Sequence, residues 1–135
     1  MIVVDTNIIG YLYLSGERSA QAESAYLKDP NWAAPLLWRN EFRNVLALYL
    51  RRDIFSLTDA MAMMNAASNL MTGREYQVPS FPVLELASKS TCSAYDCEFV
   101  ALAKELKVPL ITVDHQILFE FPSIAVYLDD FIIPE

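Results

Sequence analysis

Two short runs of apolar and β-branched residues constrain this fold most, at residues 2–4 and 110–113, and an aspartate directly follows each. Runs of this kind are typical of strands in parallel sheets, because helices cover both faces of such sheets. Further strand candidates lie at 32–34, 76–78 and 124–128, and segments with helical periodicity separate them. This alternation predicts a layered α/β domain with a mostly parallel sheet and right-handed crossovers.

The helical segments are marked by their periodicity and by signals at their ends. The clearest is expected to have Pro35 in its first turn and to run to about Arg52, with helical spacing of Trp38, Phe42, Val45, Leu46 and Tyr49. Other helices are predicted at 8–13, 19–28, 57–71, 82–89, 115–120 and from Ser93 to Pro109.

Composition indicates a single globular domain over residues 1–135. Hydrophobic residues make up 54% of the chain and charged residues 20%, which excludes a disordered chain. The net charge of −7 argues against a generic nucleic-acid binder, which carries a basic patch, although a metal ion can bridge acidic side chains to phosphate. No apolar stretch approaches the roughly 20 residues of a membrane span, so we expect a soluble, cytoplasmic protein without membrane association.

The chain has two cysteines, Cys92 and Cys97, and one histidine, His115. Cysteines five positions apart on a helix point to different faces, so a disulfide between them is not expected. One histidine and two cysteines also fall short of a zinc site. We therefore expect two buried, reduced thiols, which fits a cytoplasmic location.

Four acidic residues lie where a parallel sheet gathers its ligands, at the carboxyl ends of strands and the first turns of helices. Asp5 and Asp114 directly follow the two apolar runs, whereas Glu41 and Asp96 lie near the starts of helices. Each acid alone also has a structural explanation. Asp5 and Asp114 suit helix N-caps, Glu41 complements a helix dipole, and Asp96 completes a Ser-x-x-Asp capping box.

The positions of Glu41 and Asp96 within their helices favour a shared site. Asp96 heads the apolar stripe of its helix and Glu41 borders the buried face, where a purely solvating acid is less expected. Two carboxylates about 5 Å apart repel by roughly 3 kcal/mol at an effective dielectric of 20. Four carboxylates together are stable only if they bind protons or a cation. Because all the ligand atoms would be oxygens, the site favours Mg²⁺ or Mn²⁺ over zinc.

Four segments in order resemble a PIN domain of the VapC toxin type. They are Val-Val-Asp-Thr-Asn at 3–7, Trp-Arg-Asn-Glu-Phe-Arg-Asn-Val-Leu at 38–46, Ser-Ala-Tyr-Asp-Cys-Glu-Phe-Val-Ala-Leu-Ala at 93–103 and Val-Pro-Leu-Ile-Thr-Val-Asp at 108–114. The resemblance implies a three-layer α/β/α sandwich with a central sheet of about five strands. It also implies a metal-dependent endoribonuclease, the toxin of a type II toxin–antitoxin pair.

By the same resemblance, residues of the matching motifs take on catalytic and metal-binding roles. These are Asp5, Glu41, Asp96 and Asp114, with Thr6, Asn7 and Thr112 as supporting residues that hold ligands or water. A bound Mg²⁺ or Mn²⁺ would activate a water for attack on the RNA phosphodiester. Turn and cap chemistry explains the three supporting residues about as well.

Partners follow from the resemblance and from the charge balance. A cognate antitoxin is expected to insert an Arg or Lys into the acidic pocket, and an acidic toxin suits a basic partner. The apolar composition suits a homodimer. Arg39 and Arg43 are candidates for phosphate contacts, although a solvated helix face explains them equally. His115 is a candidate for substrate contact or for simple solvation.

Two other functions compete with the nuclease. A catalytically silent PIN-like module that binds RNA or protein remains open, although this chain keeps all four acids. A phosphoacceptor receiver domain is less favoured, because Asp5 has no acidic neighbour and Lys107 precedes its strand rather than following it.

Overall fold

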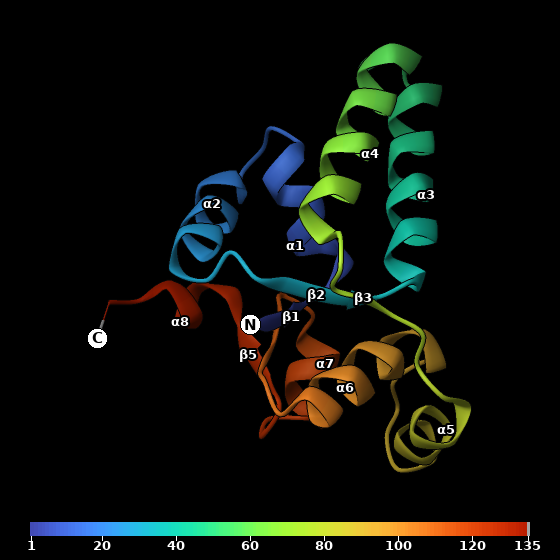
Figure 1. Cartoon of the computed structure of the whole chain (residues 1–135), viewed down its shortest axis with the longest axis vertical. Helices are drawn as coiled ribbons and strands as arrows, with labels where there is room; N and C mark the ends of the chain where they lie inside the picture. The colour runs from blue at the N-terminus through green and yellow to red at the C-terminus, as the bar shows by residue number, and fades with distance from the viewer. Residues whose placement is uncertain (135) are drawn as a thin grey trace.

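The computed structural model describes residues 1–134, in which five parallel strands form one sheet in the order β3-β2-β1-β4-β5 (Figure 1). The last residue of the predicted domain, Glu135, lies outside the described residues. The strands are β1 (Ile2–Val4), β2 (Trp32–Pro35), β3 (Glu75–Tyr76), β4 (Leu110–Thr112) and β5 (Ala125–Tyr127). The predicted parallel sheet of about five strands is confirmed.

Eight helices within residues 1–134 cover this sheet on its two sides. They are α1 (Thr6–Tyr13), α2 (Ser19–Lys28), α3 (Leu37–Arg51), α4 (Leu57–Met71), α5 (Ser80–Ser88), α6 (Ala94–Leu106), α7 (His115–Glu120) and α8 (Leu128–Ile132). Figure 1 shows α1 to α4 on one side of the sheet and α5 to α7 on the other. This arrangement confirms the three-layer sandwich. The short helix α8, which packs against α2, was not predicted.

Pro35 is assigned to the wrong element, because it ends β2 rather than opening α3. The predicted ends of α1, α5, β3 and β5 differ from the structure by one or two residues. The hydrogen bonds from β2 to β3 come from the backbone N–H groups of Ala34 and Leu36, which donate to Arg74 and Tyr76. Proline between these two donors removes no hydrogen bond from this side of the ladder. The strand therefore tolerates Pro35, and the helix begins two residues later.

The core lies between the sheet and the helices on both sides. The side chains of β1 are all buried, and so are Trp38 and Phe42 of α3 and Phe99 of α6. Burial of one such large apolar side chain contributes roughly 1.5–3 kcal/mol. Both cysteines are buried and unpaired, as predicted. Within residues 1–134, no helix has the length and apolar character to cross a membrane.

The order of the strands places a crevice between β1 and β4. From β1 the chain first builds β2 and β3 on one side, and it later adds β4 and β5 on the other. In sheets of this kind, ligands bind at the carboxyl ends of the strands where the order reverses. Asp5 directly follows β1, and Asp114 lies two residues beyond the end of β4. The topology therefore brings these two acids to one edge.

Candidate metal centre

Asp5 is the most buried acid of this edge, with only 8% of its surface exposed. It is the N-cap of α1, where its Oδ1 accepts a 2.8 Å hydrogen bond from the backbone N–H of Thr6. Its Oδ2 accepts a 2.8 Å bond from the hydroxyl of Thr112, which is fully buried at the end of β4. Hydrogen bonds from Thr6, at the start of α1, and from Thr112, at the end of β4, thus fix the orientation of the Asp5 carboxylate.

Glu41 lies in the second turn of α3 and is half-buried. Its Oε1 accepts a 2.7 Å hydrogen bond from the hydroxyl of Thr6. The backbone of Thr6 therefore holds Asp5 while its side chain holds Glu41. The structure places both threonines, Thr6 and Thr112, where the sequence resemblance implies residues that orient acidic ligands.

Asp114 is the N-cap of α7, as its structural explanation predicts. Its Oδ1 accepts hydrogen bonds from the backbone N–H groups of Gln116 at 2.9 Å and Ile117 at 3.1 Å. The hydroxyl of Thr112 accepts the backbone N–H of Asp114 at 3.0 Å. Among the described residues, no group donates a hydrogen bond to Oδ2 of Asp114, so one of its oxygens is available to a ligand.

Asp96 forms only half of its predicted capping box. The hydroxyl of Ser93 accepts the backbone N–H of Asp96 at 3.1 Å, but the Asp96 carboxylate does not accept the N–H of Ser93 in return. The second Ser-x-x-Asp sequence of the chain gives a direct comparison. At the start of α4, Ser56 and Asp59 exchange both bonds, at 3.1 and 3.2 Å. The Asp96 carboxylate is thus not committed to its helix cap.

All four acids line one polar cavity of about 250 Å³. Asn7, predicted as a supporting residue, lines the same cavity together with Thr6, Asn44 and Val45. The sequence analysis missed Asn44 as a site residue. The signal was present, because Asn44 lies three residues after Glu41 in α3, and this spacing places two side chains on neighbouring parts of a helix face.

The protonation of these acids reflects their shared surroundings. Burial, followed by the nearby charges of Glu41 and Asp96, raises the pKa of Asp5 from 3.8 to about 6, although the hydrogen bonds from Thr112 and Thr6 oppose the change. Burial and the Asp96 charge also raise the pKa of Glu41, whereas the Thr6 hydroxyl lowers it. Burial and the Asp114 charge raise the pKa of Asp96. A cation in the cavity would relieve this repulsion.

The fit of the cavity to a metal ion depends on the type of ion. Within residues 1–134, no three His, Cys, Asp or Glu side chains stand together as a ready-made metal site. The donor atoms are all carboxylate, amide and hydroxyl oxygens, however, which hard cations prefer. Mg²⁺ keeps several waters and takes one or two carboxylates directly. The four acids around a 250 Å³ cavity therefore fit a partly hydrated ion.

Two other titratable residues near the four acids in sequence, Glu98 and His115, lie outside this cavity. Glu98 lines a separate hollow beside α5, and burial together with the Glu41 charge raises its pKa. His115 is exposed at the start of α7. A larger cavity, of about 590 Å³ between α5 and α6, is mostly apolar and contains none of the four acids. The cavity around Asp5 is therefore the one that matches the predicted chemistry.

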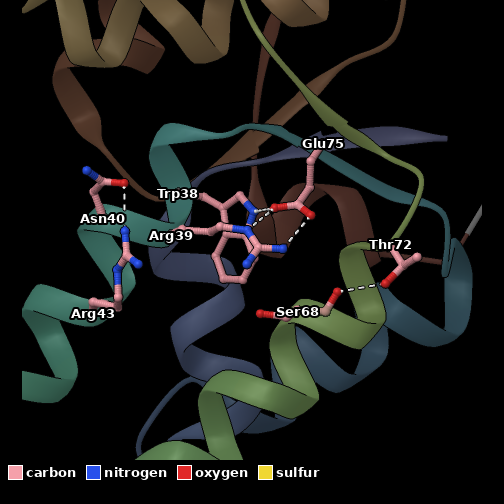
Figure 2. Close-up of polar contacts among 7 residues, drawn as sticks. All are labelled: Trp38, Arg39, Asn40, Arg43, Ser68, Thr72 and Glu75. Atoms are coloured by element: carbon pink, nitrogen blue, oxygen red, sulfur yellow. Dashed lines mark hydrogen bonds and ion pairs between the residues drawn. The ribbon is translucent and has the colours of Figure 1, made fainter.

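Arg39 and Arg43 also lie outside the acidic cavity, on the side of α3 that faces α4. Figure 2 shows the Arg39 guanidinium held by both oxygens of Glu75, at 2.5 and 2.8 Å, while the indole N–H of Trp38 donates to Glu75 at 2.8 Å. Within residues 1–134, the Arg43 guanidinium makes a hydrogen bond only to Asn40, at 3.1 Å. The structure thus engages Arg39 in an ion pair within the fold and leaves Arg43 more accessible.

Comparisons with known proteins agree with this architecture. The chain superimposes on the crystal structure of PAE2754 from Pyrobaculum aerophilum with a TM-score of 0.76 and 17% identity, over 97% of this chain and 92% of the other. It also superimposes on a toxin–antitoxin complex from Klebsiella pneumoniae with a TM-score of 0.69 and 19% identity, over 95% and 98% of the two chains. At these identities the similarity shows the fold.

Sequence comparison gives the family. The chain is 29% identical to Ribonuclease VapC3 of Pyrobaculum aerophilum over 127 residues, which are 92% of this chain and 97% of the relative. Residues 2–121 match the model of the PIN domain family, and this range includes all four acids of the cavity. The chain therefore belongs to the PIN domain family.

Proposed function

We propose that this protein is a metal-dependent endoribonuclease that hydrolyses phosphodiester bonds in RNA, as the toxin of a type II toxin–antitoxin pair. One observation carries the proposal: Asp5, Glu41, Asp96 and Asp114 line a single polar cavity at the point where the strand order reverses. Helix capping explains Asp5 and Asp114, but it does not explain Glu41, which caps no helix and lines the same cavity.

The relatives support the same function. The similarity to Ribonuclease VapC3 extends over nearly the full length of both chains. The fold is also that of a protein crystallised in a toxin–antitoxin complex. The same domain keeps all four acids that the proposed function requires.

The four acids would hold the metal, Mg²⁺ or Mn²⁺, which when bound supplies Lewis acidity and a more acidic water. The residues of the chain do the remaining work. Thr112 and Thr6 fix the carboxylates of Asp5 and Glu41, so little reorientation is needed when a substrate binds.

The charge of the protein suggests how its partners bind. With a net charge of −7 and an acidic cavity, a cognate antitoxin would present a basic segment and place an Arg or Lys among the acids. We also propose a homodimer and a cytoplasmic location, where RNA substrates occur. Arg43 would contact phosphate, whereas Arg39 could do so only by leaving Glu75.

Cleavage of a mixed RNA pool in Mn²⁺, Mg²⁺ or EDTA tests the proposal. Asp96→Asn is compared with Asp59→Asn, because both aspartates stand at the third position of a Ser-capped helix. We expect cleavage that needs metal, survives in Asp59→Asn and is lost in Asp96→Asn. Equal activity of the two variants would contradict the proposed role of Asp96.

A catalytically silent PIN-like module that binds RNA or protein is the second candidate. It is favoured by one observation, the lack of a preassembled group of three ligands within residues 1–134. Calorimetric titration with Mn²⁺ separates the two candidates. Binding that is lost in Asp96→Asn supports the enzyme, and the lack of binding in native protein and variant supports the silent module.

A further inference from the structure

Three side chains form a stack beside the acidic cavity: Arg18, His115 and Tyr127. The rings of His115 and Tyr127 are nearly parallel, at 19°, with their centroids 6.2 Å apart. The Arg18 guanidinium donates a 3.1 Å hydrogen bond to the hydroxyl of Tyr127. Its Cζ lies 5.8 Å from the centroid of the Tyr127 ring. We call these three residues the aromatic stack.

The aromatic stack lies at the same edge of the sheet as the acids. Tyr127 is the last residue of β5, and its register partner in β4 is Thr112, whose hydroxyl holds Asp5. Register partners on adjacent strands are about 5 Å apart. His115 directly follows Asp114, which lines the cavity. Two strands and one helix start therefore place the stack next to the acids.

Tyr11 of α1 lies near both the stack and the acids. Burial is the main cause of the raised pKa of Tyr11, and the charge of Asp5 and the nearby Tyr127 raise it further, while Arg18 lowers it. The Tyr11 hydroxyl is thus within electrostatic reach both of the stack and of the most buried acid of the cavity.

A purely structural role accounts for only part of the stack. Arg18 also lies 3.7 Å from Asp129, so its contacts join the start of α2 to the end of β5. This explains Arg18 and the half-buried Tyr127. It does not explain His115, which is exposed and whose imidazole makes no hydrogen bond with any of residues 1–134. The imidazole is the end of the stack that a ligand can reach.

The chemistry of the stack suits a nucleobase. Unpaired RNA bases stack on aromatic and histidine rings and on arginine guanidinium planes. Such contacts do not depend on base identity, because every base has a π-face. A protein with a net charge of −7 has little general attraction for RNA, so stacking would supply affinity that its electrostatics lacks.

We propose that His115 and Tyr127, supported by Arg18, form a subsite that stacks an unpaired RNA base next to the phosphodiester, which would bind at the metal held by the four acids. The inference rests on the proposed nuclease function, which it extends to a single-stranded substrate. It assigns substrate binding, rather than a chemical step, to the stack.

Binding of a short single-stranded RNA that contains 2-aminopurine, measured by fluorescence in EDTA, tests the subsite without cleavage. Stacking quenches the probe, and we expect His115→Ala and Tyr127→Leu to raise Kd by about tenfold or more. Tyr127→Phe keeps the ring and loses only the hydroxyl that accepts from Arg18, so it should lose less affinity than Tyr127→Leu. Phe81→Ala removes a ring that is 76% exposed on α5, and it is the matched control for His115→Ala.

His115 is exposed, so His115→Ala keeps the test valid if Tyr127→Leu fails to fold. In a cleavage assay with metal, His115→Ala should raise KM about tenfold with kcat within twofold. A Kd and a KM within twofold of native for His115→Ala would overturn the subsite and leave the nuclease intact. Base binding that His115→Ala abolishes, in a protein that cuts no RNA with any metal, would support the subsite and overturn the nuclease.

Discussion

The hydroxyl of Thr112 donates a 2.8 Å hydrogen bond to Oδ2 of Asp5 and accepts the backbone N–H of Asp114 at 3.0 Å. One buried side chain at the end of β4 thus connects the acid that follows β1 with the acid that opens α7. The geometry of the candidate centre depends on this hydroxyl as much as on the carboxylates themselves.

Thr112→Val should therefore weaken both the fold and metal binding. Valine has nearly the same shape, but it leaves the N–H of Asp114 without its acceptor, which costs about 1–3 kcal/mol. It also releases one oxygen of Asp5, and loss of such a supporting contact typically costs 10–100-fold in metal affinity. Urea denaturation and Mn²⁺ calorimetry measure the two effects.

Thr72→Val is the matched control for this substitution. The Thr72 hydroxyl donates to the backbone carbonyl of Ser68 at 3.0 Å in an exposed turn after α4 (Figure 2). Its loss should change the unfolding free energy by less than about 0.5 kcal/mol, because water replaces the bond. Equal effects of the two valine substitutions would argue against a special role for Thr112.

Asp5→Asn should stabilise the metal-free protein at neutral pH. A pKa raised from 3.8 to about 6 means that the fold favours the protonated acid, so its ionisation at pH 7 costs up to about 3 kcal/mol. The native protein loses this stability as the pH rises from about 4 to 6, whereas asparagine does not ionise. Urea denaturation in EDTA across pH 4–8 measures the difference. If Asp5→Asn were less stable than the native protein at pH 7, and its unfolding free energy changed with pH in the same way, then the ionisation of Asp5 would carry no such cost.

Mn²⁺ should stabilise the native protein and leave Asp5→Asn nearly unchanged. A ligand that binds only the folded state stabilises it, by about 2.7 kcal/mol at a concentration 100 times its Kd. The Tm of both proteins, measured by scanning calorimetry against Mn²⁺ concentration, gives the comparison. The same rise in Tm for both proteins would place the ion somewhere other than beside Asp5.

Arg43→Gln should weaken RNA binding, whereas Arg39→Gln should lower the stability of the fold. Arg43 is exposed and its one hydrogen bond within residues 1–134 is to Asn40, so its loss should raise KM for RNA and reduce the salt dependence of binding with little change in stability. Arg39 is paired with Glu75 and holds the pKa of that carboxyl below its usual range. Its loss should lower the unfolding free energy by about 1–3 kcal/mol, because the Glu75 side chain is only 13% exposed and loses two of its hydrogen bonds. Steady-state kinetics and urea denaturation separate the two cases.

Much of the fold was predictable from local signals. The helix over 19–28 and the strand at 2–4 coincide with α2 and β1, because apolar periodicity and end signals agree there. Pro35 was misplaced because its effect depends on which side of β2 carries the hydrogen bonds to β3, and this pairing is a long-range property. The short helix α8 carries acids in its first turn but has no side-chain cap to mark its start.

The four acids of the site were predictable from the sequence, whereas the residues around them were less so. Strand ends and helix starts place Asp5 and Asp114 at one edge from topology alone. Asn44 was missed although its spacing from Glu41 was visible, because an exposed asparagine in a helix has many ordinary uses. The ion pair of Arg39 depends on β3 lying beside β2, which no local pattern in α3 reveals.

If selection for catalysis is relaxed, we expect positions 5 and 96 to accept different substitutions. Asp5 caps α1 and accepts the hydroxyl of Thr112, so drift at position 5 should be confined to asparagine, serine and other residues that still cap a helix. The carboxylate of Asp96 makes no return bond to the cap of α6, so position 96 is free to become any helix-compatible residue. Inactive descendants of this chain should therefore be recognised by what replaces Asp96 before any change appears at position 5.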